Sequence, residues 1–197
     1  MTEEGAPVNV EAAISVRPTI VGGTHTLGVS FEVLFRQEFE RRYASLHRYL
    51  SRLSDDPALA ADIAQETFVR LYQRGSMPDD TGAWLATVAN NLFRNEVQGR
   101  KRRARIMDGE RATLVLADPP LLPDLEAEAN ERKTYVRAAL NGIPIRDRQL
   151  LLLRYEGFSY RELAIALDIS ESSVGTLLAR AREAFRRVLQ EDPRARE

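Results

Sequence analysis

Two helical patterns separated by a very short break, in SYRELAIALDISESSVGTLLARAREAFRRVL (residues 159–189), constrain the fold of this chain more than any other feature. Ser159 and Glu162 have the spacing of a capping box, which predicts the start of the first helix. Asp168 stands at the break, where the backbone needs a positive φ that Asp tolerates better than most residues. Ser170 is then expected to cap the second helix.

The register of this pair is typical of a helix-turn-helix. Small Ala164 lies where the two helices would touch, Asp168 follows four positions later, and apolar Val174 follows six positions after that. Such a crossing projects the second helix outward, where it can enter a major groove of DNA. The alternative is an amphipathic pair with a solvated polar face. We predict DNA contacts from the outward residues Glu171, Ser172, Ser173, Thr176, Arg180 and Arg182.

Helical spacing of apolar residues continues upstream. A stripe from Phe31 to Leu53, preceded by Ser30, predicts one helix, and Asp56-Pro57 is a typical start for the next. A third helix is expected from Thr81. No segment shows a convincing strand pattern, so the sequence predicts an all-α fold.

The charge is unevenly distributed, although the net charge is only −1. Residues 94–105 carry an excess of basic side chains, and residues 106–131 an excess of acidic ones. The second stretch contains DPPLLPD, whose prolines oppose both helix and strand. We therefore predict two small helical domains joined by a flexible acidic, Pro-containing linker. The expected boundaries are a disordered extension at 1–29, a domain at 30–105, the linker at 106–124, a helix-turn-helix domain at 125–190 and a tail at 191–197.

Composition excludes several classes of protein. The chain has no cysteine, which rules out disulfides and thiolate metal or redox chemistry, and it has no apolar run long enough to cross a bilayer. We expect a cytoplasmic protein with no membrane insertion of its own. The two histidines, His25 and His47, lack metal-ligand spacing, and there is no Gly-rich phosphate loop or nucleophile elbow. We expect neither a cofactor nor catalytic activity.

Three segments, in this order, resemble the sigma-70 family of RNA polymerase sigma factors, and within it the small extracytoplasmic-function (ECF) type. They are ADIAQETFVRLYQR (61–74), WLATVANNLFRNEVQGRKRR (84–103) and the C-terminal stretch 142–189. The resemblance covers roughly Phe31 to Leu189. It implies a helix that grips the polymerase clamp, a helix that melts and reads the −10 promoter element, and a domain that reads the −35 element.

The resemblance also implies roles for individual residues. The clamp would be bound by Asp62, Gln65, Glu66 and Phe68. The −10 element would be contacted by Met77, Asn91, Arg94, Arg100, Lys101, Arg102 and Arg103. The −35 element would be read by the six outward residues named above. Asp62 and Glu66 lie one turn apart, and as two unneutralised carboxylates on one face they favour a basic partner.

Core RNA polymerase and promoter DNA are the partners that the resemblance implies, together with an anti-sigma factor. Members of the family commonly show Arg-Asn, then Asp, then Arg where this chain has Asn90-Asn91, Asn95 and Gln98. The turn glycine is replaced by Asp168, a usual basic residue by Gly175, and a frequent polar or basic residue by Leu177. These departures predict weaker or unusual promoter recognition.

Two other functions fit part of the pattern. A helix-turn-helix regulator that never binds polymerase would share the C-terminal pattern but lack the ADIAQETF-like helix followed by a basic helix. A sigma-like decoy would bind an anti-sigma factor without directing transcription. The ordered combination of segments favours a sigma factor.

Overall fold

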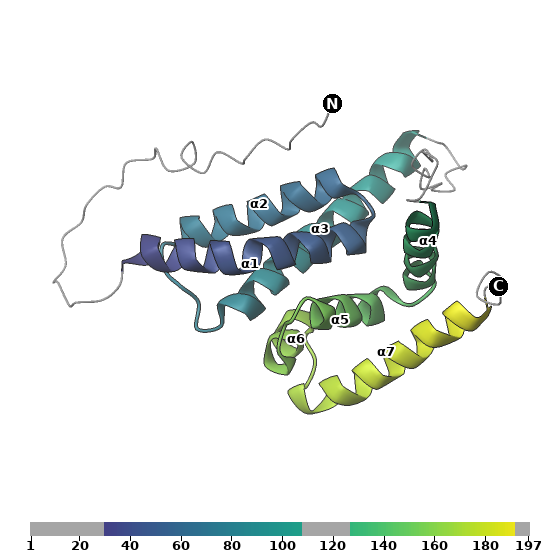
Figure 1. Cartoon of the computed structure of the whole chain (residues 1–197). Coiled ribbons are helices and arrows are strands. Elements are labelled where there is room, and N and C mark those ends of the chain that lie inside the picture. Colours follow the sequence, from purple (N-terminus) through teal and green to yellow (C-terminus); the bar gives the residue numbers. More distant parts are fainter. Residues whose placement is uncertain (1–29, 108–126, 192–197) are drawn as a thin grey trace.

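The computed structural model describes residues 30–107 and 127–191, and all regular structure within these ranges is helical, which confirms the all-α fold class (Figure 1). The helices are α1 (Phe31–Ser54), α2 (Pro57–Arg74), α3 (Thr81–Met107), α4 (Ala127–Asn141), α5 (Ile145–Tyr155), α6 (Tyr160–Leu167) and α7 (Glu171–Glu191). The α3 helix continues two residues into the predicted linker. The predicted extension, the remainder of the linker and the last six residues lie outside the described ranges.

Helices α1 to α3 form an N-terminal bundle whose boundaries follow from local capping. Asp56 accepts a hydrogen bond from the Leu59 amide at 3.0 Å, with Pro57 at the first helical position. Gly75 ends α2 with φ 69°, and Asp80 starts α3 by accepting from the Ala83 amide at 2.9 Å. These caps therefore fix where the short loop between α2 and α3 begins and ends.

The apolar stripes of these three helices meet in a core. Phe68 is 2% exposed and packs edge-on against Phe39, with ring centroids 5.0 Å apart. Burying each large apolar side chain contributes on the order of 1.5–3 kcal/mol. The other fully or almost fully buried side chains of the bundle include Leu46, Tyr49, Leu50, Leu71 and Leu85.

Helices α4 to α7 form a C-terminal group that contains the expected helix-turn-helix. The capping box is present: the Ser159 hydroxyl accepts from the Glu162 amide at 3.2 Å, and the Glu162 carboxylate accepts from the Ser159 amide at 2.7 Å. Asp168 adopts the left-handed conformation, with φ 52°. The prediction for this turn is confirmed.

The two groups pack directly on each other. Helices α5 and α6 lie beneath α1 and α3, and α7 lies on the far side of them (Figure 1). Leu150, Leu153, Phe158 and Leu163 of the C-terminal group join the same core cluster as the bundle residues. No helix in the described part of the chain is long and apolar enough to cross a membrane.

Candidate nucleic-acid interface

The outer face of α7 is largely exposed. Val174, Leu178 and Ala181 are buried and anchor the helix on its inner side. Arg180 and Arg182 are exposed and form no ion pair within the described part of the chain. Of the remaining predicted contacts, Ser173 is half-buried and the others, Glu171, Ser172 and Thr176, are exposed. A ridge of hydroxyls and arginines on a firmly anchored helix is suited to phosphates and base edges.

The turn before α7 is held from outside by α5. One guanidinium nitrogen of Arg146 donates to the carbonyl oxygens of Leu167 and Asp168, at 2.9 and 3.0 Å. The Ile169 amide also donates to the Ala164 carbonyl at 3.0 Å, which closes the end of α6. These bonds explain how the turn is kept with Asp where the family has Gly. Sequence reasoning did not identify Arg146.

Two other departures from the family pattern have structural correlates on α7. Leu177 is half-buried and packs against the core, which accounts for an apolar residue there. A Cβ at Gly175 would lie 3.8 Å from the ring of Tyr160, an ordinary contact, so packing does not require glycine. Ser170 directly precedes α7, with its hydroxyl 2.7 Å from that of Ser172.

The second half of α3 carries the basic cluster, in which Arg94 and the four residues 100–103 are exposed. Arg100 reaches Glu96 and Asp56, both at 3.1 Å, and Arg103 reaches Glu96 at 2.8 Å. The hydrogen bond from Arg100 holds the pKa of Glu96 below its ordinary value. Arg94, Lys101 and Arg102 form no ion pair within the described residues. Part of the cluster is therefore engaged within the chain, and part remains available to phosphates.

Two other predicted −10 contacts lie in different surroundings. Asn91 is exposed on α3, whereas Met77, in the loop before α3, is half-buried against the core. The departures Asn95 and Gln98 are exposed, and nothing in the structure explains them.

The outer face of α2 presents Asp62, Gln65 and Glu66, all exposed. Glu66 pairs with Arg70 at 2.8 Å, so the prediction of two unneutralised carboxylates is wrong for Glu66. Phe68 is buried among the aromatic rings of α1, which argues against the direct polymerase contact expected for it. Its burial instead keeps α2 in place against α1.

A buried polar cluster between the two groups was not foreseen from the sequence. The Asn90 side chain is 1% exposed, and its Oδ1 accepts from the Tyr49 hydroxyl at 2.5 Å and from Gln149 Nε2 at 3.2 Å. Burial raises the pKa of Tyr49, so its hydroxyl stays protonated and acts as a donor. Tyr49 and Asn90 belong to the bundle, and Gln149 belongs to α5. The only signal in the sequence was the departure from the family pattern at Asn90.

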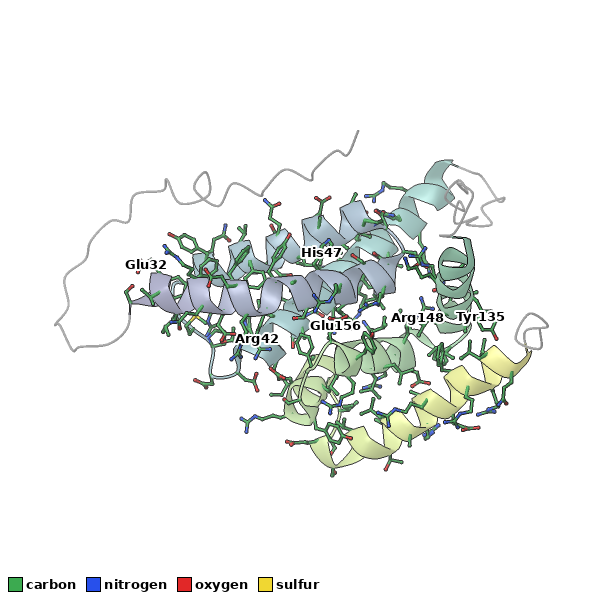
Figure 2. The ribbon with its side chains drawn as sticks, in the orientation of Figure 1. Glu32, Arg42, His47, Tyr135, Arg148 and Glu156 are labelled. Atoms are coloured by element: carbon green, nitrogen blue, oxygen red, sulfur yellow. The ribbon has the colours of Figure 1, made fainter. Side chains whose placement is uncertain are left out.

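Several ion pairs also join the two groups. Glu156, at the end of α5, lies between α5 and α1, where it meets Arg48 at 2.9 Å and also Arg52 (Figure 2). Arg42 of α1 reaches Glu162 of α6 at 2.9 Å. Asp55, which directly follows α1, meets Arg137 of α4 at 2.6 Å. Each pair joins the bundle to the C-terminal group.

A cleft of about 940 Å³ opens between the two groups. One wall is the second half of α3, including Asn91, Arg94 and Lys101, and the opposite wall is formed by α5 and α6, including Arg146 and Leu167. The structure thus places some predicted −10 contacts in the cleft. The predicted clamp residues on α2 and the outer face of α7 take no part in it.

Comparison with known proteins gives two matching family descriptions, "Sigma-70 region 2" over residues 39–103 and "Sigma-70, region 4" over residues 133–185. The chain is 32% identical over 163 residues to ECF RNA polymerase sigma factor SigL of Mycobacterium tuberculosis, covering 80% of this chain and 90% of that protein. It is 33% identical over 144 residues to the probable RNA polymerase sigma factor RfaY of Xanthomonas campestris, covering 70% of this chain but 36% of that protein.

Solved structures share the fold. The sigma factor RpoE of Bartonella quintana, in complex with the anti-sigma factor NepR, matches with a TM-score of 0.60 and 24% identity, over 80% of this chain and 98% of that one. CnrH in complex with the cytosolic domain of CnrY matches with a TM-score of 0.59 and 19% identity, over 82% and 90%.

Proposed function

This chain belongs to the sigma-70 family of RNA polymerase sigma factors, in its ECF type, and we propose that it directs core RNA polymerase to promoters through three separate surfaces. The observation that carries the proposal is the outer face of α7, an anchored helix with exposed hydroxyls and with arginines that form no ion pair within residues 30–107 and 127–191. We assign −35 recognition to this face.

The −10 element is assigned to α3. Arg94, Lys101 and Arg102 form no ion pair within the described residues, so they can each meet a phosphate without breaking an internal bond. Arg100 and Arg103 must first exchange their carboxylate partners for DNA. Asn91 and Met77 complete the proposed surface, with Met77 as an apolar contact that would have to leave its packing to meet a base.

The polymerase clamp is assigned to α2, through Asp62, Gln65 and Glu66. The exposed face of this helix offers two acids and an amide on a rigid element. Glu66 would exchange its pair with Arg70 for a basic residue of the polymerase. Phe68 supports this face from within and does not contact the clamp while α1 and α2 remain packed.

The proposal places catalysis in the polymerase and none in this chain, with no cofactor and with action in the cytoplasm. We also propose a regulatory partner of the anti-sigma class. Its support is the shared fold with RpoE, which was solved together with the anti-sigma factor NepR.

The experiment is transcription of pooled genomic promoter fragments by core polymerase, with and without the purified chain. New start sites that share two spaced elements support the proposal. Polymerase binding without new starts would instead support the decoy, and neither binding nor starts would support a helix-turn-helix regulator. Arg180→Ala is the matched variant, because it removes one outward arginine of α7 and leaves α2 and α3 unchanged.

A further inference from the structure

We propose that the cleft between the bundle and the C-terminal group is a binding site for a free nucleotide, whose phosphates meet its cations and whose base meets its amides and apolar side chains. The inference goes beyond the proposed function, which assigns no small molecule to the cleft. The volume of about 940 Å³ is in the range of small-molecule sites. Four features of the lining carry the inference: its charge, an unsatisfied donor, the order of side chains along α3 and the apolar wall opposite.

The lining of the cleft carries more positive than negative charge. Its ionisable residues are five bases and two acids: Arg94, Arg100, Lys101, Arg146, Arg148, Asp55 and Asp168. Arg100 is already engaged by carboxylates of the chain, whereas Arg94 and Lys101 form no ion pair within the described residues. Cations come from both walls, since Arg146 and Arg148 lie on α5. The ligand that this lining suits is therefore an anion, and phosphates are the anions that such clusters bind best.

Arg148 brings an unsatisfied donor to the same lining. Its two terminal nitrogens donate to Asn141, an uncharged residue, and its Nε is buried without a hydrogen-bond partner. Burial lowers the pKa of its guanidinium, although the charge of Asp55 acts in the opposite direction. A half-buried cation that is bonded only to an amide is stabilised when an anion binds nearby. Arg148 therefore favours an occupied cleft.

The stripe of α3 that lines the cleft alternates amides and cations. Its members are Asn91, Arg94, Gln98 and Lys101, all exposed and spaced three or four residues apart, which places them on one face of the helix. An Asn or Gln side chain presents a donor and an acceptor together, which matches the edge of a nucleobase. Amides beside cations on one short stripe suit a ligand that joins a base to phosphates.

The wall opposite α3 supplies apolar surface. Ile145 of α5 and Ile165 of α6 both line the cleft, and they are 49% and 48% exposed, unlike the buried apolar residues of the core. Leu167 adds to the same wall. A flat base that packs on these side chains removes apolar surface from water, which favours binding. The chain has no Gly-rich phosphate loop, so its side chains alone would hold the phosphates.

Two variants test opposite walls of the cleft. Lys101→Ala removes a cation from α3, and Ile165→Glu places a carboxylate on the α6 wall. Both positions are exposed, so the helices should persist, which circular dichroism checks. Each variant has a matched control outside the lining. Arg102→Ala removes the next cation along α3, and Val136→Glu makes the same kind of change at an apolar residue of α4 that is 38% exposed.

The measurement is fluorescence anisotropy of ATP and GTP labelled on the ribose, titrated with the full chain in the absence of polymerase and DNA. The parent and both controls should bind at least one of the two nucleotides with similar affinity. Each cleft variant should bind it about tenfold more weakly, the effect expected when one charge-assisted contact is lost. Unlabelled ATP, GTP and inorganic triphosphate are then compared as competitors, and the nucleotide should compete better than triphosphate alone.

Three results would overturn the proposal. The first is the absence of binding to either nucleotide at millimolar concentration. The second is normal affinity in either cleft variant, or an equal loss in a matched control, because the nucleotide would then lie on the outer side of the basic helix. The third is equal competition by inorganic triphosphate, which would show an anion site that does not recognise a base. Neither polymerase nor promoter enters the measurement, so its failure would leave the proposed function intact.

Discussion

At the scale of single residues, Asp168 shows how a turn that favours glycine is built without it. The residue has φ 52°, and Arg146 of α5 donates hydrogen bonds to its own carbonyl oxygen and to that of Leu167. Left-handed backbone costs an L-residue roughly 1–2 kcal/mol, and Asp less than most. The turn thus depends on a side chain that is distant in sequence.

Asp168→Gly should raise the free energy of unfolding by roughly 0.5 kcal/mol, because relief of the left-handed strain exceeds the added freedom of glycine in the unfolded chain. Asp168→Ala should lower it by about 1 kcal/mol. Urea unfolding followed by circular dichroism measures both. Equal stability of the Gly and Ala variants would show that the backbone conformation at this turn carries no strain.

Glu162 makes the stability of the fold depend on pH in the acidic range. Burial raises the pKa of its carboxyl, but the hydrogen bonds from Ser159 and the guanidinium of Arg42 outweigh burial and leave the pKa below its ordinary value of 4.5. The unfolded chain therefore takes up this proton first as the pH falls. The stabilisation is complete above the ordinary value and is lost as the pH falls through the lower folded value.

Stability should accordingly decline below about pH 4.5, and Glu162→Gln should make the decline less steep. Glutamine can keep the capping box with Ser159 but loses the charge that pairs with Arg42. Urea midpoints measured from about pH 6 to about pH 3 test this. An identical slope in the parent and the variant would mean that Glu162 is not a source of the acid sensitivity.

At the scale of helices, the described chain separates surfaces that hold the fold from surfaces that are free to bind. The inner side of α7 is buried at Val174, Leu178 and Ala181, while its outer side carries arginines without ion pairs in the described part of the chain. Helix α2 has the same division, with Phe68 inside and Asp62 outside. Substitutions on the outer faces should therefore alter binding without altering stability.

Arg180→Ala should weaken binding to the −35 element by roughly 1–3 kcal/mol if it contacts a base, and leave polymerase binding unchanged. Arg187→Ala is the matched control, an exposed arginine further along the same helix. Fluorescence anisotropy with the promoter found above measures DNA binding, and a pull-down measures polymerase binding. A loss of both activities in the Arg180 variant would show that the division of labour between α7 and α2 is wrong.

Glu66→Lys should impair binding to core polymerase while the fold persists. It reverses the charge on the outer face of α2 and removes the pair with Arg70, which itself contributes only about 0.3–0.5 kcal/mol. Glu40→Lys, an exposed site on α1, makes the same charge change elsewhere. Normal polymerase affinity of the Glu66 variant, with an unchanged circular dichroism spectrum, would exclude this face as the clamp contact.

Helix boundaries could be predicted from the sequence because they depend on neighbouring residues. Asp56-Pro57 and the Ser159–Glu162 box act within one turn of the chain. The Glu66–Arg70 pair was also foreseeable, since the two residues are four apart. The burial of Asn90 was not foreseeable, because it depends on Gln149, 59 residues away.

At the scale of the whole molecule, the bundle and the C-terminal group share one apolar core, which extends from Leu46 to Leu178. Phe158 and Leu163 of the C-terminal group belong to the same cluster as Phe68 and Leu85 of the bundle. Two groups that bury apolar surface against each other gain stability from each other.

Differential scanning calorimetry of the free chain should therefore show one cooperative transition. Glu156→Lys, which sets a cation against Arg48 and Arg52, should divide it into two, one for each group. A single transition in both proteins, at the same temperature, would mean that the ion pairs of Glu156 contribute little to the coupling between the groups.

The contacts of Glu156 with Arg48 and Arg52 have a consequence for how substitutions could alter the set of promoters that the chain uses. Under the proposed function, substitutions on the outer face of α7 would alter contacts with particular base pairs, so they would change the ranking of promoters. Glu156 lies between α1 and α5, away from the outer face of α7, so a substitution there would change how firmly the two groups are held together and leave the proposed reading residues in place. Mutations between the bundle and the C-terminal group would thus affect all promoters alike, whereas mutations on the outer face of α7 would change which promoters are used.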